Sequence, residues 1–263
     1  MTGALAWPAV IVLATWWLST GVVLGLVWLG PGSRWFTMAL ATVVALAGVL
    51  GVLSSRAESS TEGVYLAFAS ALAIWAWHEL SFLLGVVTGP WRQRCPPDAT
   101  GWRRFGFATR AVIHHELALA LSLVALVAVT WGATNQVATS TFAALWAMRL
   151  STKLNIFLGV KNLTEEFIPE HLQYLRSFFR QGKANPLLPT SIVVGAAFSC
   201  WVLGSAFTAG LGEGAQLAQL VVGTLLALGV LEHLFLAVPL REAALWRWAI
   251  RARTPVEVPT GRP

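Results

Sequence analysis

Long apolar stretches alternate with short polar segments along the whole chain. A helix needs about 20 mainly apolar residues to cross a hydrocarbon core of about 30 Å. Seven stretches meet that requirement: 5–29, 35–53, 64–88, 108–131, 138–159, 188–208 and 217–240. The short alternating segments of a strand barrel do not occur. The pattern predicts an all-α, polytopic membrane bundle of about seven transmembrane helices, in a single integral membrane domain over residues 1–263.

Composition supports a membrane environment, and the positions of the cations predict an orientation. Hydrophobic residues make up 56% of the chain and charged residues 11%, whereas soluble domains have roughly 25% charged residues. With seven spans, Arg56 is the single cation on the side of the N-terminus, and the remaining 17 of the 18 Lys and Arg residues fall on the opposite side. Because positively charged loops stay in the cytoplasm, we expect the N-terminus outside and the C-terminus in the cytoplasm.

The basic residues beside the spans suit the anionic headgroups of membrane lipid. Topology and lipid together explain the net charge of +6, so we expect no nucleic-acid partner. The cytoplasmic side is elaborated in three segments, 89–110, 160–187 and 241–263.

The segment 160–187 predicts an amphipathic helix that lies at the membrane interface. Pro169 suits the first position of a helix, and one face of that helix would carry Leu172, Leu175 and Phe179. Polar residues of this segment are secondary candidates for ligand binding: Glu165, Glu166, Glu170 and His171.

Histidine and glutamate stand side by side inside three predicted spans, where charged side chains are rare. All five histidines of the chain lie in the stretches WHEL, HHEL, PEHL and LEHL. The candidates for ligand or metal binding within the spans are His78, Glu79, His114, His115, Glu116, Glu232 and His233. Arg149 and Lys153, one turn apart on one helix face, complete a charge network.

These charged residues are predicted to form one layer, about 10 to 15 Å from the cytoplasmic helix ends at 1.5 Å per residue. A charge near the bilayer centre costs at least about 2.5 to 3.5 kcal/mol, so such residues face the interior and find partners. Three glutamates against two cations leave a charge of −1. One protonated histidine or a bound cation would balance that charge.

Three readings of this layer are open: an internal ion-pair network, a metal or ligand site, and a path for protons or substrate. Carboxylate and imidazole together suit iron, manganese or zinc. Di-metal bundles use Glu-x-x-His spacing, whereas adjacent residues point about 100° apart on a helix, so each pair can send only one member to the centre. The chain has no HExxH, P-loop, GxSxG or Rossmann motif, which gives hydrolase and nucleotide-dependent chemistry no support.

Several long stretches carry a resemblance to a known family. They are TFAALWAMRLSTKLNIFLGVKNLTEEFIPEHLQYLRSFFR, WHELSFL, HHELALA and LEHLFLAVPL. Over residues 64–250 the chain resembles the photosynthetic complex assembly protein 2 family of phototrophic proteobacteria, called PuhE. The resemblance implies a multi-pass protein of the bacterial inner membrane, either cytoplasmic or intracytoplasmic photosynthetic. It also implies a gene among photosynthesis genes and a link to bacteriochlorophyll supply.

The resemblance gives the His/Glu layer a further meaning, because the magnesium of bacteriochlorophyll is commonly ligated by a neutral histidine. The cofactor expectation is therefore a bound metal ion or bacteriochlorophyll. We expect a non-enzymatic factor for assembly of the photosynthetic reaction centre and core antenna complex, with the subunits of that complex and other assembly factors as partners. The alternative is a membrane metalloenzyme, with His/Glu-ligated iron, manganese or zinc, that acts on a tetrapyrrole, quinone or carotenoid.

Overall fold

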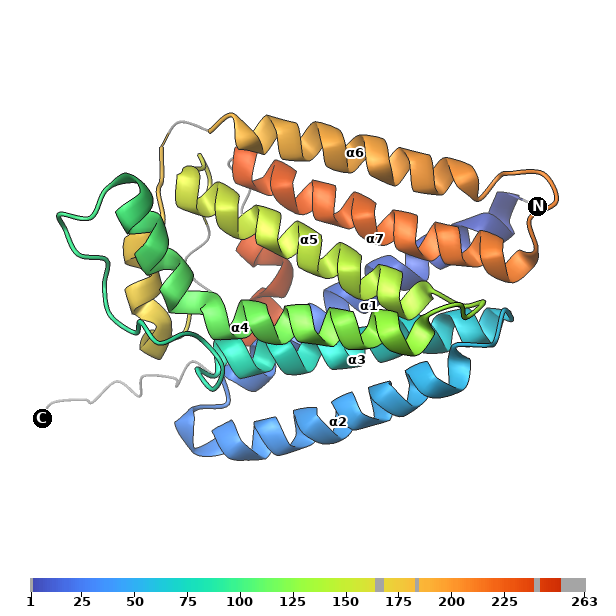
Figure 1. Ribbon diagram of the computed structural model, residues 1–263, viewed down its shortest axis with the longest axis horizontal. Coiled ribbons are helices and arrows are strands. Elements are labelled where there is room, and N and C mark those ends of the chain that lie inside the picture. The colour runs from blue at the N-terminus through green and yellow to red at the C-terminus, as the bar shows by residue number, and fades with distance from the viewer. Residues whose placement is uncertain (1, 164–167, 183–184, 239–241, 252–263) are drawn as a thin grey trace, which may run out of the picture.

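The computed structural model describes residues 2–163, 168–182, 185–238 and 242–251, and within these ranges it is all-helical. The long helices are α1 (Thr2–Val27), α2 (Arg34–Ser55), α3 (Thr61–Leu83), α4 (Gly101–Thr130), α5 (Val137–Leu158), α6 (Leu187–Ser205) and α7 (Glu213–Ala237). The short ones are η1 (Pro31–Ser33), η2 (Glu170–Phe178), η3 (Glu242–Trp246) and α8 (Arg247–Arg251). Figure 1 shows the long helices side by side, with α2 and α6 on opposite sides of the bundle.

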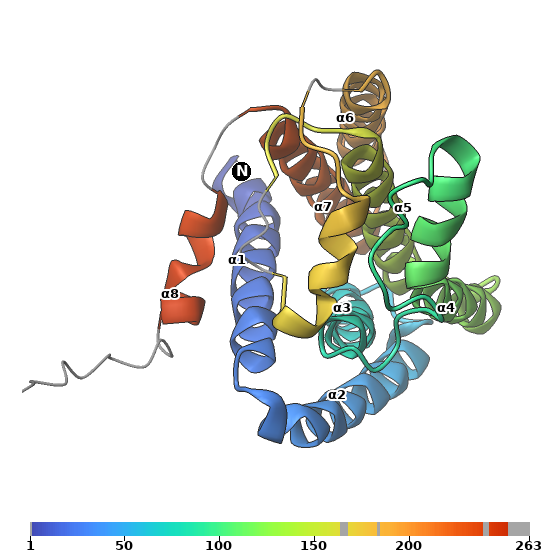
Figure 2. The same cartoon turned by 90° about the vertical axis from the view of Figure 1, so that its left-hand side faces the viewer.

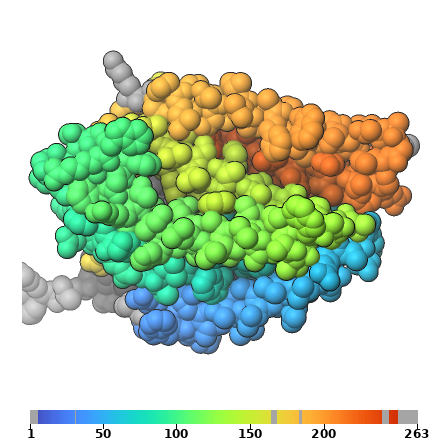
Figure 3. All heavy atoms as spheres, viewed as in Figure 1, coloured from blue at the N-terminus to red at the C-terminus, as the bar shows by residue number. Residues whose placement is uncertain are grey.

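Six of the long helices are long and apolar enough to cross a membrane, which is compatible with the expected multi-pass membrane protein. Helix α5 is not among the six. It contains Arg149, Lys153 and Asn155, yet it lies within the bundle and contacts α3, α4, α6 and α7. In the space-filling view α5 reaches the surface as a strip between α4 and α6 (Figure 3). Polar residues of α5 that contact neighbouring helices face protein rather than lipid, which lets a span carry them.

The helix boundaries depart from the predicted spans at α3 and α4. Helix α3 ends at Leu83, five residues before the predicted end at residue 88. Gly85 has a φ of +70°, a left-handed conformation that favours glycine, so the chain leaves the helix although the next residues are still apolar. Helix α4 begins at Gly101, seven residues before the predicted start at 108. The segment 89–110, one of the three predicted cytoplasmic elaborations, is therefore a loop up to residue 100 and helical from residue 101.

In the described part of the segment 160–187, the predicted amphipathic helix is a 3₁₀ helix, η2, rather than a regular α-helix. Its buried apolar residues are Leu172, Leu175 and Phe178. Because a 3₁₀ helix has three residues per turn, the third member of the face is Phe178 and not the predicted Phe179. This face packs in one cluster with Phe82 of α3 and Ala111 of α4, and Figure 2 shows η2 lying across the end of the bundle.

Two further contacts fix η2 and the C-terminal segment. Arg104 of α4, which is buried, donates to the carbonyl oxygens of Phe178 at 2.5 Å and Phe157 at 3.2 Å. In the C-terminal segment, the Leu245 carbonyl accepts from Trp17 Nε1 of α1, and Trp246 Nε1 donates to the Trp17 carbonyl. Helix α8 consequently lies beside α1 (Figure 2), so the described part of 241–263 folds back onto the bundle.

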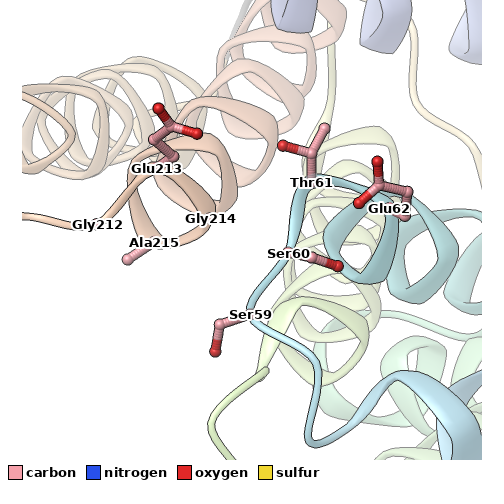
Figure 4. A pocket seen from close by; sticks show the side chains of 8 residues that line it. All are labelled: Ser59, Ser60, Thr61, Glu62, Gly212, Glu213, Gly214 and Ala215. Atoms are coloured by element: carbon pink, nitrogen blue, oxygen red, sulfur yellow. The ribbon is translucent and has the colours of Figure 1, made fainter.

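The connections gather at two ends of the bundle, as Figure 1 shows. One end holds the loop 84–100 and η2, and we call it the cation-rich end. The sequence pattern assigns a single cation, Arg56 in the link between α2 and α3, to the other end. At that other end a groove of about 540 Å³ lies between residues 59–62 and 212–215, drawn in Figure 4. A Cβ on Gly214 would run into the backbone carbonyl of Ser59, so these two segments approach closely because residue 214 has no side chain.

Candidate functional site

Two ion pairs join the central helix α5 to its neighbours. Arg149 Nη2 donates to Glu79 Oε2 of α3 at 3.0 Å, and Lys153 Nζ donates to Glu116 Oε1 of α4 at 2.5 Å. The two carboxylate side chains are mostly buried, with exposed fractions of 12% for Glu79 and 15% for Glu116. Because the two cations lie one turn apart on the same face, a single face of α5 is held against both α3 and α4.

Tryptophan N–H groups bind two further carboxylate oxygens of the layer. Trp146 Nε1 donates to Glu116 Oε2 at 3.0 Å, so both oxygens of Glu116 are engaged. Trp16 Nε1 of α1 donates to Glu232 Oε1 of α7 at 3.0 Å. Arg149 also interacts electrostatically with Glu232 and Glu116. The sequence-predicted charges are thus brought into one connected layer across five helices.

The two members of each His–Glu pair contact different helices. In α3, Glu79 pairs with α5, while His78 Nε2 lies 2.8 Å from Ser122 Oγ of α4. In α7, Glu232 faces α1, while His233 contacts α5. This division follows from the roughly 100° between adjacent residues on a helix.

The environment of His233 fixes its tautomer. Its Nδ1 lies 2.7 Å from the Gly229 carbonyl, which can only accept, so Nδ1 carries the proton. Its Nε2 therefore accepts from the Ser151 hydroxyl at 2.9 Å. Ser151 Oγ also lies 3.1 Å from Ser191 Oγ of α6, and Asn155 Nδ2 donates to Ser191 Oγ at 3.1 Å. His233 is the fully buried centre of a neutral polar junction between α5, α6 and α7.

The HHE sequence of α4 sends its three side chains to different environments. His114 is exposed on the outside of the bundle, so it is not part of the internal layer. His115 is completely buried, with its ring 4.7 Å from the ring of Phe82. In η2, Glu170 is exposed and His171 Nε2 donates to the Leu83 carbonyl at 2.9 Å. Glu165 and Glu166 lie outside the described residues.

The arrangement also bears on the metal hypothesis. Within the part of the chain that the structure describes, no group of three or more His, Cys, Asp and Glu side chains is placed to hold a metal ion. Glu79 and Glu116 instead turn toward the cations of α5. The geometry that these described residues show is that of an ion-pair network.

Outside the spans, two groups at the cation-rich end have perturbed pKa values. A hydrogen bond of 2.7 Å from Arg103 holds the pKa of Asp98 below its usual value. Burial raises the pKa of the Tyr174 hydroxyl in η2. Both groups keep their ordinary charge near neutral pH, so Asp98 is anionic and Tyr174 is neutral.

Sequence reasoning missed the neutral partners of the layer. Ser122, Ser151 and Trp16 were not singled out, although each binds a candidate residue. A usable signal existed for α5 alone, where Ser151 and Asn155 stand four residues apart and therefore share a helix face. Nothing in the sequence links Trp16 to Glu232, because 216 residues separate them.

Comparison with known proteins adds a family and a relative. A family described as "Protein of unknown function (DUF3623)" matches residues 2–257. The chain is 34% identical over 251 residues to a Rhodobacter capsulatus protein named "Uncharacterized 30.4 kDa protein in puhA 5'region". That alignment covers 92% of this chain and 91% of the relative. No solved structure matches the chain.

Proposed function

The chain belongs to the DUF3623 family, and we propose that it is a membrane factor for assembly of the photosynthetic reaction centre and core antenna. A relative that aligns over 91% of its own length is named for the region 5' of puhA. The location of that relative is the observation that carries the proposal. It agrees with the resemblance to the photosynthetic complex assembly protein 2 family, PuhE, which implies a gene among photosynthesis genes.

The proposal includes a topology of seven spans in the bacterial inner membrane, with the N-terminus outside and the C-terminus in the cytoplasm. Two observations support it. The seven long helices lie side by side with α1 beginning and α7 ending at opposite ends (Figure 1). The cation-rich end would then face the cytoplasm, as the positive-inside rule requires. Helix α5 crosses with the others because its charged residues are paired inside the bundle.

In this role the charged layer holds the helices in one arrangement. The cations of α5 fasten it to α3 and α4, and Trp16 joins α1 to α7 through Glu232. A bundle held in this way presents η2 and the loop 84–100 at its cytoplasmic end. We propose that this end contacts subunits of the photosynthetic complex and other assembly factors, and that its basic residues contact anionic lipid.

A non-enzymatic role is favoured over the metalloenzyme by the ion pairs. A carboxylate that neutralises a neighbouring Arg or Lys serves packing, and Glu79 and Glu116 are both used in this way. The link to bacteriochlorophyll supply rests on the resemblance alone. It adds no residue to the site described above.

The experiment is deletion of the gene in the phototrophic bacterium that encodes it, followed by complementation with the intact chain. We expect the deletion strain to lose near-infrared absorbance of the core complex, and the intact gene to restore it. Growth by respiration is the control, because it needs no photosynthetic complex. Full core-complex absorbance in the deletion strain would overturn the proposed function.

A further inference from the structure

Unsatisfied polar atoms are concentrated near the cation-rich ends of α3 and α4. Buried atoms without a hydrogen-bond partner among the described residues include both ring nitrogens of His115, His78 Nδ1 and Glu79 Oε1. The hydroxyls of Thr88 and Tyr174 belong to the same set. Native proteins leave few buried polar groups unsatisfied, and each such group calls for a partner.

These residues form a continuous series from η2 to the charged layer. The Tyr174 hydroxyl lies near that of Thr88 without meeting hydrogen-bond geometry. The Thr88 carbonyl accepts from the backbone N–H of His115 at 3.0 Å. The His115 ring lies 6.4 Å from the ring of His78. His78 in turn interacts electrostatically with Glu79, which pairs with Arg149.

The geometry limits what can satisfy the two imidazoles. His115 and His78 are 0% and 4% exposed, so neither ring reaches bulk water. Their ring centroids are too far apart for a direct hydrogen bond, but one water can bridge them because each hydrogen bond spans about 2.9 Å. Buried waters commonly make about three hydrogen bonds to groups of this kind.

We propose that His78 and His115 share a buried water, and that Thr88 and Tyr174 continue a hydrated path from it to the cation-rich end. The path gives protons access to the Glu79–Arg149 pair from the side of η2. Chains of Glu and His with intervening polar groups are the usual means of moving protons inside membrane proteins. The inference is independent of the photosynthetic role proposed above, since it concerns hydration of this chain alone.

The test is exchange of the histidine ring protons with deuterium, followed by nitrogen NMR of histidine-labelled full-length protein in lipid nanodiscs. Transfer to deuterium oxide should replace the ring protons of His78 and His115 about as fast as that of the exposed His171. The measurement needs no substitution, so it does not depend on the folding of a variant. If either buried ring keeps its proton for hours, the region is sealed and the path does not exist.

Two variants test the shared water. His115→Phe keeps an aromatic ring but removes both nitrogens, so it should shift the ring nitrogen signals of His78. His114→Phe is the matched control, because it changes the neighbouring residue whose side chain is exposed, and it should leave those signals in place. An unchanged His78 spectrum in both variants overturns the shared water.

A third variant tests the outer part of the path. Tyr174→Phe removes one hydroxyl and should slow exchange of the His115 ring proton several-fold. An unchanged exchange rate would show that the path does not pass Tyr174 and would overturn that part of the proposal.

Discussion

Arg149 and Glu79 meet at 3.0 Å between α5 and α3, with the carboxylate side chain 12% exposed and the guanidinium side chain 40% exposed. Arg149 is nine residues from the end of α5 and Glu79 four residues from the end of α3, or about 13 Å and 6 Å along the helix axes. Glu79 thus lies nearer its helix end than the predicted depth of about 10 to 15 Å, but its side chain is mostly buried, so solvent screens this pair less than an exposed pair.

Arg149→Met should lower the yield of folded protein sharply. Removing one partner of a buried pair leaves the other charge uncompensated, at a cost of about 3 to 5 kcal/mol. Glu79→Gln in the same chain should restore part of the yield, because the double variant has no uncompensated charge. The measurement is size-exclusion chromatography of a fluorescent fusion in detergent. Normal yield for Arg149→Met would mean that the pair does not stabilise the fold.

The matched control for that variant is Arg103→Met. Arg103 and Asp98 also form an ion pair, at 2.7 Å, but their side chains are 60% and 64% exposed. Exposed pairs contribute little to stability, so the yield of Arg103→Met should stay near that of the unmutated protein. A similar loss in both variants would indicate a general effect of removing arginine.

The packing at the end opposite the cation-rich end predicts an effect at Gly214. Gly214→Val should destabilise the protein by about 1 to 3 kcal/mol, because the new Cβ meets the Ser59 carbonyl and backbone cannot rotate away as a side chain can. Gly212→Ala is the control, since nothing lies within 4 Å of a Cβ at that position. Thermal unfolding in detergent, followed by tryptophan fluorescence, should separate the two variants by several degrees. Equal unfolding temperatures would contradict the close approach of Gly214 to the Ser59 carbonyl.

The helices could be predicted from sequence because a bilayer imposes its thickness on every span. Helix ends were less predictable where apolar residues continue past a backbone turn, as they do after Gly85 at the end of α3. The number of residues per turn in η2 could not be predicted from its apolar residues. Leu172 and Leu175 fit both three and 3.6 residues per turn, and only the burial of Phe178 distinguishes the two.

The candidate site was predictable in its charges but not in its contacts. A glutamate or arginine inside a span is costly unless it has a partner. Glu79 and Arg149 could therefore be identified from the sequence as members of one network. Which partner each finds depends on helix rotation and on residues far away in sequence. Neutral partners such as Ser122 carry no such signal, since serine is common in membrane helices.

Metal analysis should find iron, manganese and zinc far below one equivalent per chain in purified protein. The reason is that Glu79 and Glu116 are held by Arg149 and Lys153, so a metal ion would have to displace a cation already in place. The measurement is elemental analysis of protein in a metal-buffered solution. Near-stoichiometric metal that disappears in Glu79→Gln or Glu116→Gln would favour the metalloenzyme.

The proposed topology predicts opposite results for two reporter fusions. A reporter that works only in the cytoplasm should be active when fused after Pro263 and silent when inserted between Thr208 and Leu211, in the link between α6 and α7. The expectation follows from the cation-rich end facing the cytoplasm. The reverse pattern would overturn the orientation, and activity at both positions would show that α7 does not cross the membrane.

Histidine substitutions distinguish a packing role from ligand binding. His233→Ala removes a fully buried ring with two hydrogen bonds, so it should cost about 1 to 3 kcal/mol and lower the amount of protein in the membrane. His78→Ala and His115→Ala should behave in the same way, because each ring is also buried. His114→Ala, whose side chain is exposed, should have no effect. In all four strains, core-complex absorbance should fall only in proportion to protein level.

The ratio of core-complex absorbance to protein level distinguishes the two roles. In the packing role histidine is neutral, so its loss leaves every charge of the layer in place. A ligand role would separate the two measurements: protein would accumulate normally while near-infrared absorbance of the core complex disappeared. Membrane protein level and absorbance are therefore measured in the same cells. One variant of a buried histidine could accumulate normally and lose the absorbance while His114→Ala keeps it. The ring nitrogen of that histidine would then coordinate a ligand that assembly requires, and the ion-pair network would support that site.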